Sequence, residues 1–218
     1  MNGYFITGTD TNVGKTYVTC ALARRARGLG QRIFAFKPIE TGCSPGHDGR
    51  LLGADQELLV AAAGDWQQGE LRGLYRFPLP AAPRVAAEAA GAVIDLDAVV
   101  EVAGRGAASA RALVEGAGGW RVPITRTADM SALARALALP VVVVARAGLG
   151  TINHSLLTVE AIERDGLQVA GLVLSQRSED DPEFTISNQR EISRRWPGLV
   201  VVLSSDTSAL DPLVVHST

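Results

Sequence analysis

The chain has 218 residues, 47% of them hydrophobic, 20% charged and 5% aromatic, and its formal net charge is -2. This composition predicts a single globular domain over residues 1–218, and the balanced charge gives no reason to expect nucleic acid or acidic membranes as partners. The two cysteines form no metal-binding pair and no apolar run reaches the ~20 residues of a membrane span, so we expect a cytoplasmic protein.

Short apolar runs alternate with longer helical segments along the chain. Strands are predicted at residues 4–6, 33–36, 113–114, 141–144, 169–174 and 199–203, and helices at residues 16–29, 50–63, 95–108, 129–139, 152–164 and 183–195. The strands lack polar alternation, as expected when helices cover both faces of a parallel sheet. This order predicts an α/β fold, a three-layer sandwich with a mostly parallel central sheet.

Two segments are predicted to lie outside the regular elements. Residues 74–83 contain three prolines, which excludes a central strand or a helix interior and predicts a connector over the sheet. Residues 177–182 are charged and end in proline, so we expect an exposed loop there.

The strongest functional signal is Gly-Thr-Asp-Thr-Asn-Val-Gly-Lys-Thr at residues 8–16, between the first strand and the first helix. In a phosphate-binding loop (P-loop), glycines let successive N–H groups point at phosphate oxygens, Lys15 reaches the terminal phosphates and the Thr16 hydroxyl binds Mg²⁺. Gly8 and Gly14 enclose five residues instead of the usual four. The alternative is a glycine-rich turn that binds no ligand.

Further candidates follow other strands, because ligands of a parallel sheet bind at the carboxyl ends of the strands. Lys37 follows the second strand and faces either the same phosphates as Lys15 or solvent. Glu115 is expected to end the third strand and to hold Mg²⁺, or else to cap the next loop. Asp55 is a candidate third oxygen ligand, with Asp48 as the alternative.

Residues 148–154, Gly-Leu-Gly-Thr-Ile-Asn-His, follow the fourth strand and open another helix. They form a second potential anion site, with Thr151 as the expected N-cap. We expect His154 to be a packed or capping side chain and not a catalytic one.

Four segments together resemble the dethiobiotin synthetase family: residues 7–16, 37–42, 114–119 and 148–154. The five-residue gap in the P-loop is that family's own form. The resemblance implies a P-loop NTPase-like fold and a homodimeric ligase that depends on Mg²⁺ and ATP. It implies that 7,8-diaminopelargonate and CO₂ become dethiobiotin, with ADP and phosphate, through a carbamate and a carbamic-phosphoric anhydride.

The resemblance also implies roles for individual residues, carried over by motif. Lys37, Lys15 and Thr11 would be catalytic, and Thr16, Asp55 and Glu115 would hold Mg²⁺. Nucleotide contacts are implied at Asn12, Val13, Gly14, Lys15, Thr16, Tyr17, Asp55, Glu115, Gly116, Ala117, Gly118, Ser175 and Gln176. Substrate contacts are implied at Thr11, Lys37 and Thr41 of one subunit and at Gly150, Thr151 and Asn153 of its partner.

The sequence departs from the family at the positions that would bind the base. The family usually has Asn after the strand at residues 172–174 and Gly-x-Ile-Pro after the last strand, where this chain has Ser175-Gln176 and Ser204-Ser205-Asp206. We therefore predict a relaxed or altered nucleotide preference. The main alternative function is a switch ATPase of the partitioning or cluster-assembly class, although residues 9–12 lack the second lysine usual there. A non-catalytic regulatory domain is the other alternative.

Overall fold

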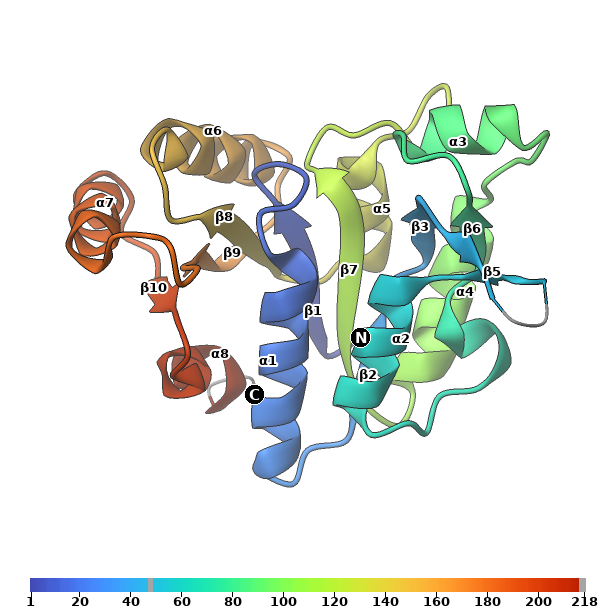
Figure 1. Ribbon diagram of the computed structural model, residues 1–218, viewed down its shortest axis with the longest axis horizontal. Coiled ribbons are helices and arrows are strands. Elements are labelled where there is room, and N and C mark those ends of the chain that lie inside the picture. The colour runs from blue at the N-terminus through green and yellow to red at the C-terminus, as the bar shows by residue number, and fades with distance from the viewer. Residues whose placement is uncertain (47–48, 216–218) are drawn as a thin grey trace.

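The computed structural model describes residues 1–46 and 49–215, so the alternative metal ligand Asp48 lies outside the described residues. Six strands form one sheet in which every neighbouring pair is parallel. In spatial order they are β10 (Val200–Leu203), β9 (Val169–Ser175), β8 (Val141–Arg146), β1 (Gly3–Gly8), β7 (Arg111–Gly119) and β2 (Ile33–Phe36) (Figure 1). This arrangement confirms the predicted α/β fold with a parallel central sheet.

Helices cover both faces of the sheet and divide the hydrophobic core in two. One core includes α1 (Lys15–Gly28), α2 (Ala54–Ala63) and α8 (Asp211–Val215); the other includes α3 (Pro83–Ala89), α4 (Leu96–Ala107), α5 (Met130–Leu137), α6 (Thr151–Arg164) and α7 (Pro182–Arg195). The adjacent residues Phe5 and Ile6 are both fully buried, one in each core. Because successive strand residues point to opposite faces, two covered faces explain the continuous apolar runs.

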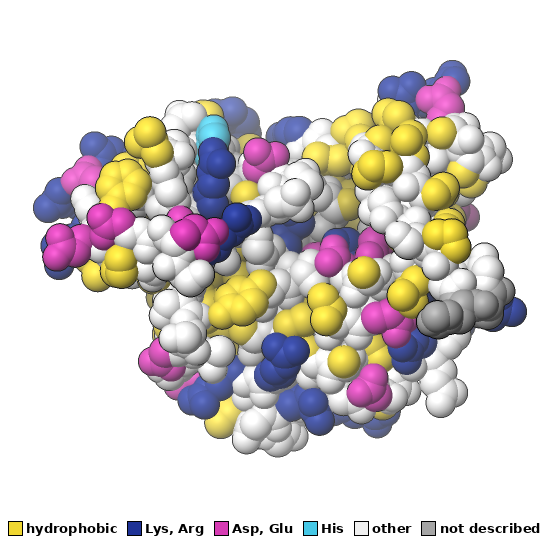
Figure 2. Space-filling model, in the orientation of Figure 1, with side chains coloured by type: hydrophobic (Ala, Val, Ile, Leu, Met, Phe, Trp, Pro, Cys, Tyr) yellow, Lys and Arg dark blue, Asp and Glu magenta, His cyan; other side chains and the backbone are white. Residues whose placement is uncertain are grey.

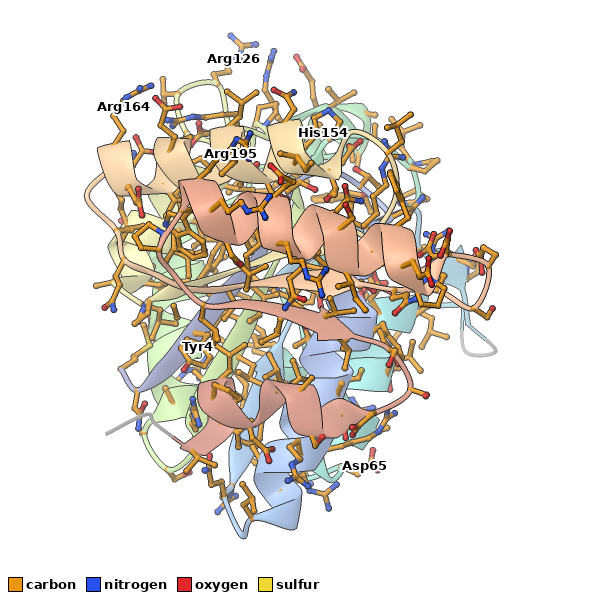
Figure 3. All side chains as sticks on the ribbon, turned by 90° about the vertical axis from the view of Figure 1, so that its left-hand side faces the viewer. Tyr4, Asp65, Arg126, His154, Arg164 and Arg195 are labelled. Atoms are coloured by element: carbon orange, nitrogen blue, oxygen red, sulfur yellow. The ribbon has the colours of Figure 1, made fainter. Side chains whose placement is uncertain are left out.

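Seen from the β10 edge, α6 and α7 lie on one side of the sheet and α8 lies on the other, next to α1 (Figure 3). Within residues 1–46 and 49–215, no helix combines the length and the hydropathy needed to cross a lipid bilayer.

Shorter elements lie beside the main sheet. β3 (Ile39–Thr41) pairs in parallel with β6 (Tyr75–Phe77), and β4 (Ser44–Pro45) pairs antiparallel with β5 (Leu51–Leu52). Two 3₁₀ helices, η1 (Gly69–Arg72) and η2 (Thr207–Leu210), complete the fold.

Two predicted segments differ from the structure. The helix predicted from residue 50 begins at Ala54, because residues 51 and 52 pair with β4 instead. The predicted connector at residues 74–83 contains β6 and ends at the first residue of α3. That residue is Pro83, which suits a helix start because an N–H there would have no partner within the helix.

Two predicted positions at element ends also differ. Glu115 lies inside β7, because the strand continues to Gly119. The pairing of β7 with β1 passes from Ile6↔Glu115 to Gly8↔Gly119, so residues 116–118 form a bulge in the longer strand. At α6 the N-cap is Gly150, with φ +89°, and Thr151 is the first helical residue.

Candidate active site

The P-loop emerges at the middle of the sheet, because β1 lies between β8 and β7. Asn12, with φ +57°, and Gly14, with φ +98°, turn the backbone back toward the start of α1. Gly14 is the N-cap of α1 and no side chain caps the helix, so its first N–H groups face the cleft. The Lys15 ammonium donates to the Asp10 carbonyl oxygen at 3.0 Å, across the loop.

Lys37 and Glu115 meet beside this loop. The Lys37 side chain is 8% exposed, and its ammonium forms ion pairs with Asp55 and, at 3.0 Å, with Glu115. The carboxylate of Glu115 is fully buried and also accepts hydrogen bonds from the hydroxyls of Thr16, at 2.8 Å, and Thr19, at 2.9 Å. Predicted residues from α1, α2, β7 and the end of β2 therefore converge on one point.

The two lysines at this point have opposite pKa shifts. Burial lowers the pKa of Lys15 to about 8, because it outweighs the attraction of Glu115. Burial also disfavours the charged form of Lys37, but Glu115 and Asp55 outweigh it and raise the pKa of Lys37 above its usual value. Lys37 is therefore a permanent cation at physiological pH, whereas Lys15 titrates in the weakly alkaline range.

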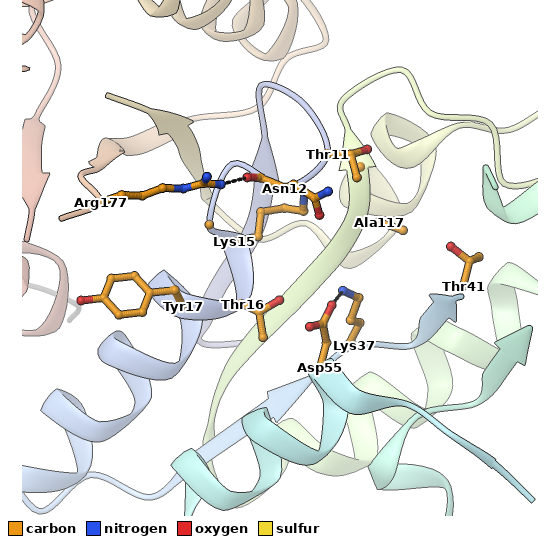
Figure 4. A pocket seen from close by; sticks show the side chains of 12 residues that line it. Thr11, Asn12, Lys15, Thr16, Tyr17, Lys37, Thr41, Asp55, Ala117 and Arg177 are labelled. Atoms are coloured by element: carbon orange, nitrogen blue, oxygen red, sulfur yellow. Dashed lines mark hydrogen bonds and ion pairs between the residues drawn. The ribbon is translucent and has the colours of Figure 1, made fainter. Parts of the chain in front are cut away.

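A cleft of about 490 Å³ opens over these residues (Figure 4). Eleven of the predicted site residues line it: Thr11, Asn12, Gly14, Lys15, Thr16, Tyr17, Lys37, Thr41, Asp55, Ala117 and Gly118. We call this region the phosphate end of the site.

Two further clefts continue from the phosphate end. The base end, about 790 Å³, lies at the ends of β9 and β10 and is lined by Ser175, Gln176, Ser204 and Ser205, among others. The substrate end, about 550 Å³, lies beside residues 80–83 and shares Thr11 and Thr41 with the phosphate end. In the space-filling view the surface is hollowed between the α6–α7 side, where arginine and acidic side chains gather, and the more hydrophobic α3 side (Figure 2).

Some predicted residues do not line these three clefts. Val13 packs into the core and Gly116 is buried against the Phe5 ring. Gly150, Thr151 and Asn153 lie at the start of α6 and line none of the three clefts of their own chain. Gly150 and Asn153 are exposed, whereas Thr151 is buried. Their assignment to a partner's substrate remains a prediction.

Two residues that contact the site, Arg177 and Thr19, are not among the predicted site residues. Arg177 is exposed in a loop, as predicted, and its guanidinium donates to the Asn12 carbonyl oxygen at 2.8 Å and lines both the phosphate end and the base end (Figure 4). The rule that polar residues after strands face the ligand would have identified it. Thr19 follows Thr16 by three residues, which places both hydroxyls on the same face of α1.

The oxygen atoms near Lys37 fit a magnesium ion. Mg²⁺ binds one or two carboxylates together with phosphates and water, and Asp55, Glu115 and the Thr16 hydroxyl supply such donors. The described residues contain no group of three or more His, Cys, Asp or Glu side chains suited to a metal. A metal at this site would thus depend on nucleotide phosphates and water for its remaining ligands.

Comparisons with known proteins place the chain among relatives of known name. A family profile described as an AAA domain matches residues 2–201. The chain is 48% identical over 196 residues to the ATP-dependent dethiobiotin synthetase BioD of Anaeromyxobacter dehalogenans (strain 2CP-C), covering 89% of this chain and 85% of the relative. It is 38% identical over 192 residues to the enzyme of the same name from Nitrosospira multiformis, covering 88% and 81%.

A solved structure with a similar fold is the signal recognition particle receptor FtsY from Elizabethkingia anophelis. Its TM-score is 0.53 at 13% sequence identity, over 96% of this chain and 61% of the receptor. This similarity concerns the fold alone.

Proposed function

Because the chain belongs to the dethiobiotin synthetase family, we propose that it is an ATP-dependent ligase that makes dethiobiotin from 7,8-diaminopelargonate and CO₂. In the first step one substrate amine bonds to the carbon of CO₂ and loses a proton, which gives a carbamate. A carbamate oxygen then bonds to the γ-phosphorus of ATP as the bond to ADP breaks. The second amine bonds to the carbamoyl carbon and loses a proton, the bond from that carbon to the phosphate oxygen breaks, and the urea ring closes as phosphate leaves.

Such a reaction needs charge neutralisation and alignment more than a covalent nucleophile, because it joins two anions at the phosphoryl group. Lys15 and Lys37 both line the cleft and would bind the transferring phosphoryl group. Thr11 and Thr41 line both the phosphate end and the substrate end, where they would hydrogen-bond the carbamate and the diamine.

Thr16, Asp55 and Glu115 would hold Mg²⁺, which would supply further positive charge to the phosphates. The Lys37 ammonium now lies between the Asp55 and Glu115 carboxylates, so this position already suits a cation. Lys37 is then expected to turn toward the γ-phosphate when Mg²⁺ and ATP bind.

The substrate end suits an aliphatic diamine. Residues 80–83 and Val122 give it apolar walls next to the threonine hydroxyls. The substrate carboxylate would bind the N-terminus of α6 in the partner subunit, at Gly150, Thr151 and Asn153. This arrangement requires a homodimer.

The observation that carries the proposal is the Lys37 ammonium between two carboxylates, next to a P-loop and an apolar substrate cleft. The test incubates the purified chain with MgATP, bicarbonate and 7,8-diaminopelargonate and measures dethiobiotin and phosphate together. We expect equal amounts of both products, and no phosphate above background without the diamine. ATP hydrolysis that ignores the diamine would instead support the switch ATPase, which the relatives do not favour.

A further inference from the structure

A buried carboxylate with no part in the steps above lies behind the phosphate end. Glu40, on β3, is 6% exposed. Its two oxygens accept the backbone N–H groups of Asp55, at 2.9 Å, and Gln56, at 3.0 Å. A charged side chain is costly to bury unless it is hydrogen-bonded, and here both oxygens bind the first turn of α2.

The start of α2 is built to receive this carboxylate. Its N-cap is Gly53, which has no side chain to accept the first N–H groups of the helix. A Cβ at Gly53 would lie 2.6 Å from an oxygen of Glu40, so a larger residue there would displace the carboxylate. Glu40, on β3, therefore supplies the cap that the residues next to α2 lack. Its negative charge suits the positive end of the helix dipole.

The turn that Glu40 holds carries two side chains that bind Lys37. The Asp55 carboxylate contacts the Lys37 ammonium. The Gln56 side-chain oxygen accepts the Lys37 backbone N–H at 2.5 Å, and its amide nitrogen donates to the Ala35 carbonyl oxygen at 3.2 Å. Both ends of Lys37 are thus bound by the turn that Glu40 fixes.

Glu40 also links this turn to the substrate end. Thr41 follows it in β3, and successive residues of a strand point in opposite directions. Glu40 faces α2, while Thr41 lines the phosphate and substrate ends.

We propose that Glu40 is a positioning residue, which fixes the first turn of α2 so that Asp55 holds the Lys37 ammonium and Gln56 holds the Lys37 backbone at the phosphate end. The effect of Glu40 on kcat rests on the proposed function. Its effects on the stability of the first turn of α2 and on the environment of the Lys37 ammonium do not.

The test compares Glu40→Gln with Glu57→Gln. Both substitutions replace a glutamate near the start of α2 by glutamine. Glu57 is the control because it pairs with Arg72 and does not line the cleft. In Glu40→Gln we expect faster amide hydrogen exchange at residues 55 and 56 and a shifted NMR signal of the Lys37 ammonium. We expect kcat to fall about 10–100-fold, the usual effect of losing a residue that orients a functional group, with the KM for ATP within about twofold. Glu57→Gln should change none of these.

Equal exchange rates, Lys37 signals and kcat values in the two variants would overturn the proposal. If Glu40→Gln does not fold, Glu40→Asp keeps the charge on a shorter side chain and should show the same changes at smaller size; a wild-type kcat and Lys37 signal there would also overturn it. If the wild type makes no dethiobiotin, the proposed function fails, and the exchange and NMR measurements still decide on Glu40.

Discussion

The phosphate end and the base end of the site are built from different chemistry. At the phosphate end, charged side chains hold one another: Lys37 pairs with Asp55 and Glu115, and Thr16 donates to Glu115. At the base end, the ends of β9 and β10 supply neutral side chains, Ser175, Gln176, Ser204 and Ser205, and the loop after β9 adds Arg177 and Asp180. The charges of the phosphate end are paired within the protein, and we expect only Lys37 to turn when Mg²⁺ and ATP bind. The β9 and β10 walls of the base end, in contrast, present few groups whose geometry distinguishes one base from another.

This difference indicates where the free energy of catalysis and binding lies. Interactions of preorganised charges with a phosphoryl group are strong because water is excluded and no reorganisation is needed. Neutral hydrogen bonds that exchange with water contribute only about 0.5–1.5 kcal/mol each. We therefore expect large effects from changes at the phosphate end and small effects at the base end.

Removing the Lys37 charge should have the largest effect. We expect Lys37→Gln to lower kcat about 10²–10³-fold, the usual loss when a preorganised group that stabilises the transition state is removed. The measurement is dethiobiotin formation at saturating MgATP, with circular dichroism to confirm that the variant folds.

Arg72→Gln serves as the control for this variant, because it removes a cation whose partner, Glu57, lies outside the cleft. It should keep its turnover within about twofold. Near-normal turnover of Lys37→Gln would show that the charge at this position is not used in the reaction.

The phosphate end was largely predictable from sequence because its parts follow strands or occupy a contiguous motif. The P-loop lies between β1 and α1, and Lys37 follows β2, so the parallel sheet alone brings them to one edge. The same reasoning predicted the correct strand for Glu115 but put the residue at the end of that strand. The structure continues β7 past Glu115 through a bulge, and the small residues that form the bulge give no clear signal in the sequence.

The contacts between distant elements were not predictable in this way. Glu40 caps a helix that begins fourteen residues later, at Ala54, and its role depends on how β3 packs against α2. Arg177 contacts the P-loop only because β9 ends near Gly14. Such contacts depend on tertiary packing, which produces no repeating pattern of residues in the sequence and therefore could not be predicted from it.

The pH dependence of nucleotide binding distinguishes the roles of Lys15 and Lys37, because only Lys15 changes its charge in the weakly alkaline range. Its pKa of about 8 means that the ammonium is present below pH 8 and is lost as the pH rises further. Bound phosphates stabilise the charged form, so nucleotide affinity should be weaker at higher pH. We expect the Kd for MgATP to rise about tenfold between pH 8 and pH 9.5, measured by calorimetry.

Lys37 should not contribute to this profile, because its raised pKa keeps it charged over the whole range. Lys15→Arg is the matched variant, since a guanidinium does not titrate there. It should give a flat profile even if its affinity is lower, and a flat profile in the wild type would contradict the role of Lys15.

A substitution at the N-terminus of α6 tests whether the site needs a second subunit. Asn153 is exposed and lies outside the three clefts of its own chain, so Asn153→Ala should leave folding intact. We expect the KM for 7,8-diaminopelargonate to rise about tenfold with kcat nearly unchanged, because a hydrogen bond to a charged group is lost. Glu160→Gln, near the other end of α6, is the control, and an equal KM in both variants would rule out the carboxylate site in the partner.

The smallest effects should come from exchanging the base. If the hydroxyls of Ser175, Ser204 and Ser205 are the main contacts, each neutral hydrogen bond gained or lost changes binding by at most about tenfold. We therefore expect kcat/KM for CTP and GTP to lie within about tenfold of that for ATP, measured as dethiobiotin formed with each nucleotide. Strict dependence on ATP would mean that the base end also holds preorganised groups specific for adenine. The two ends would then not differ in preorganisation as described above.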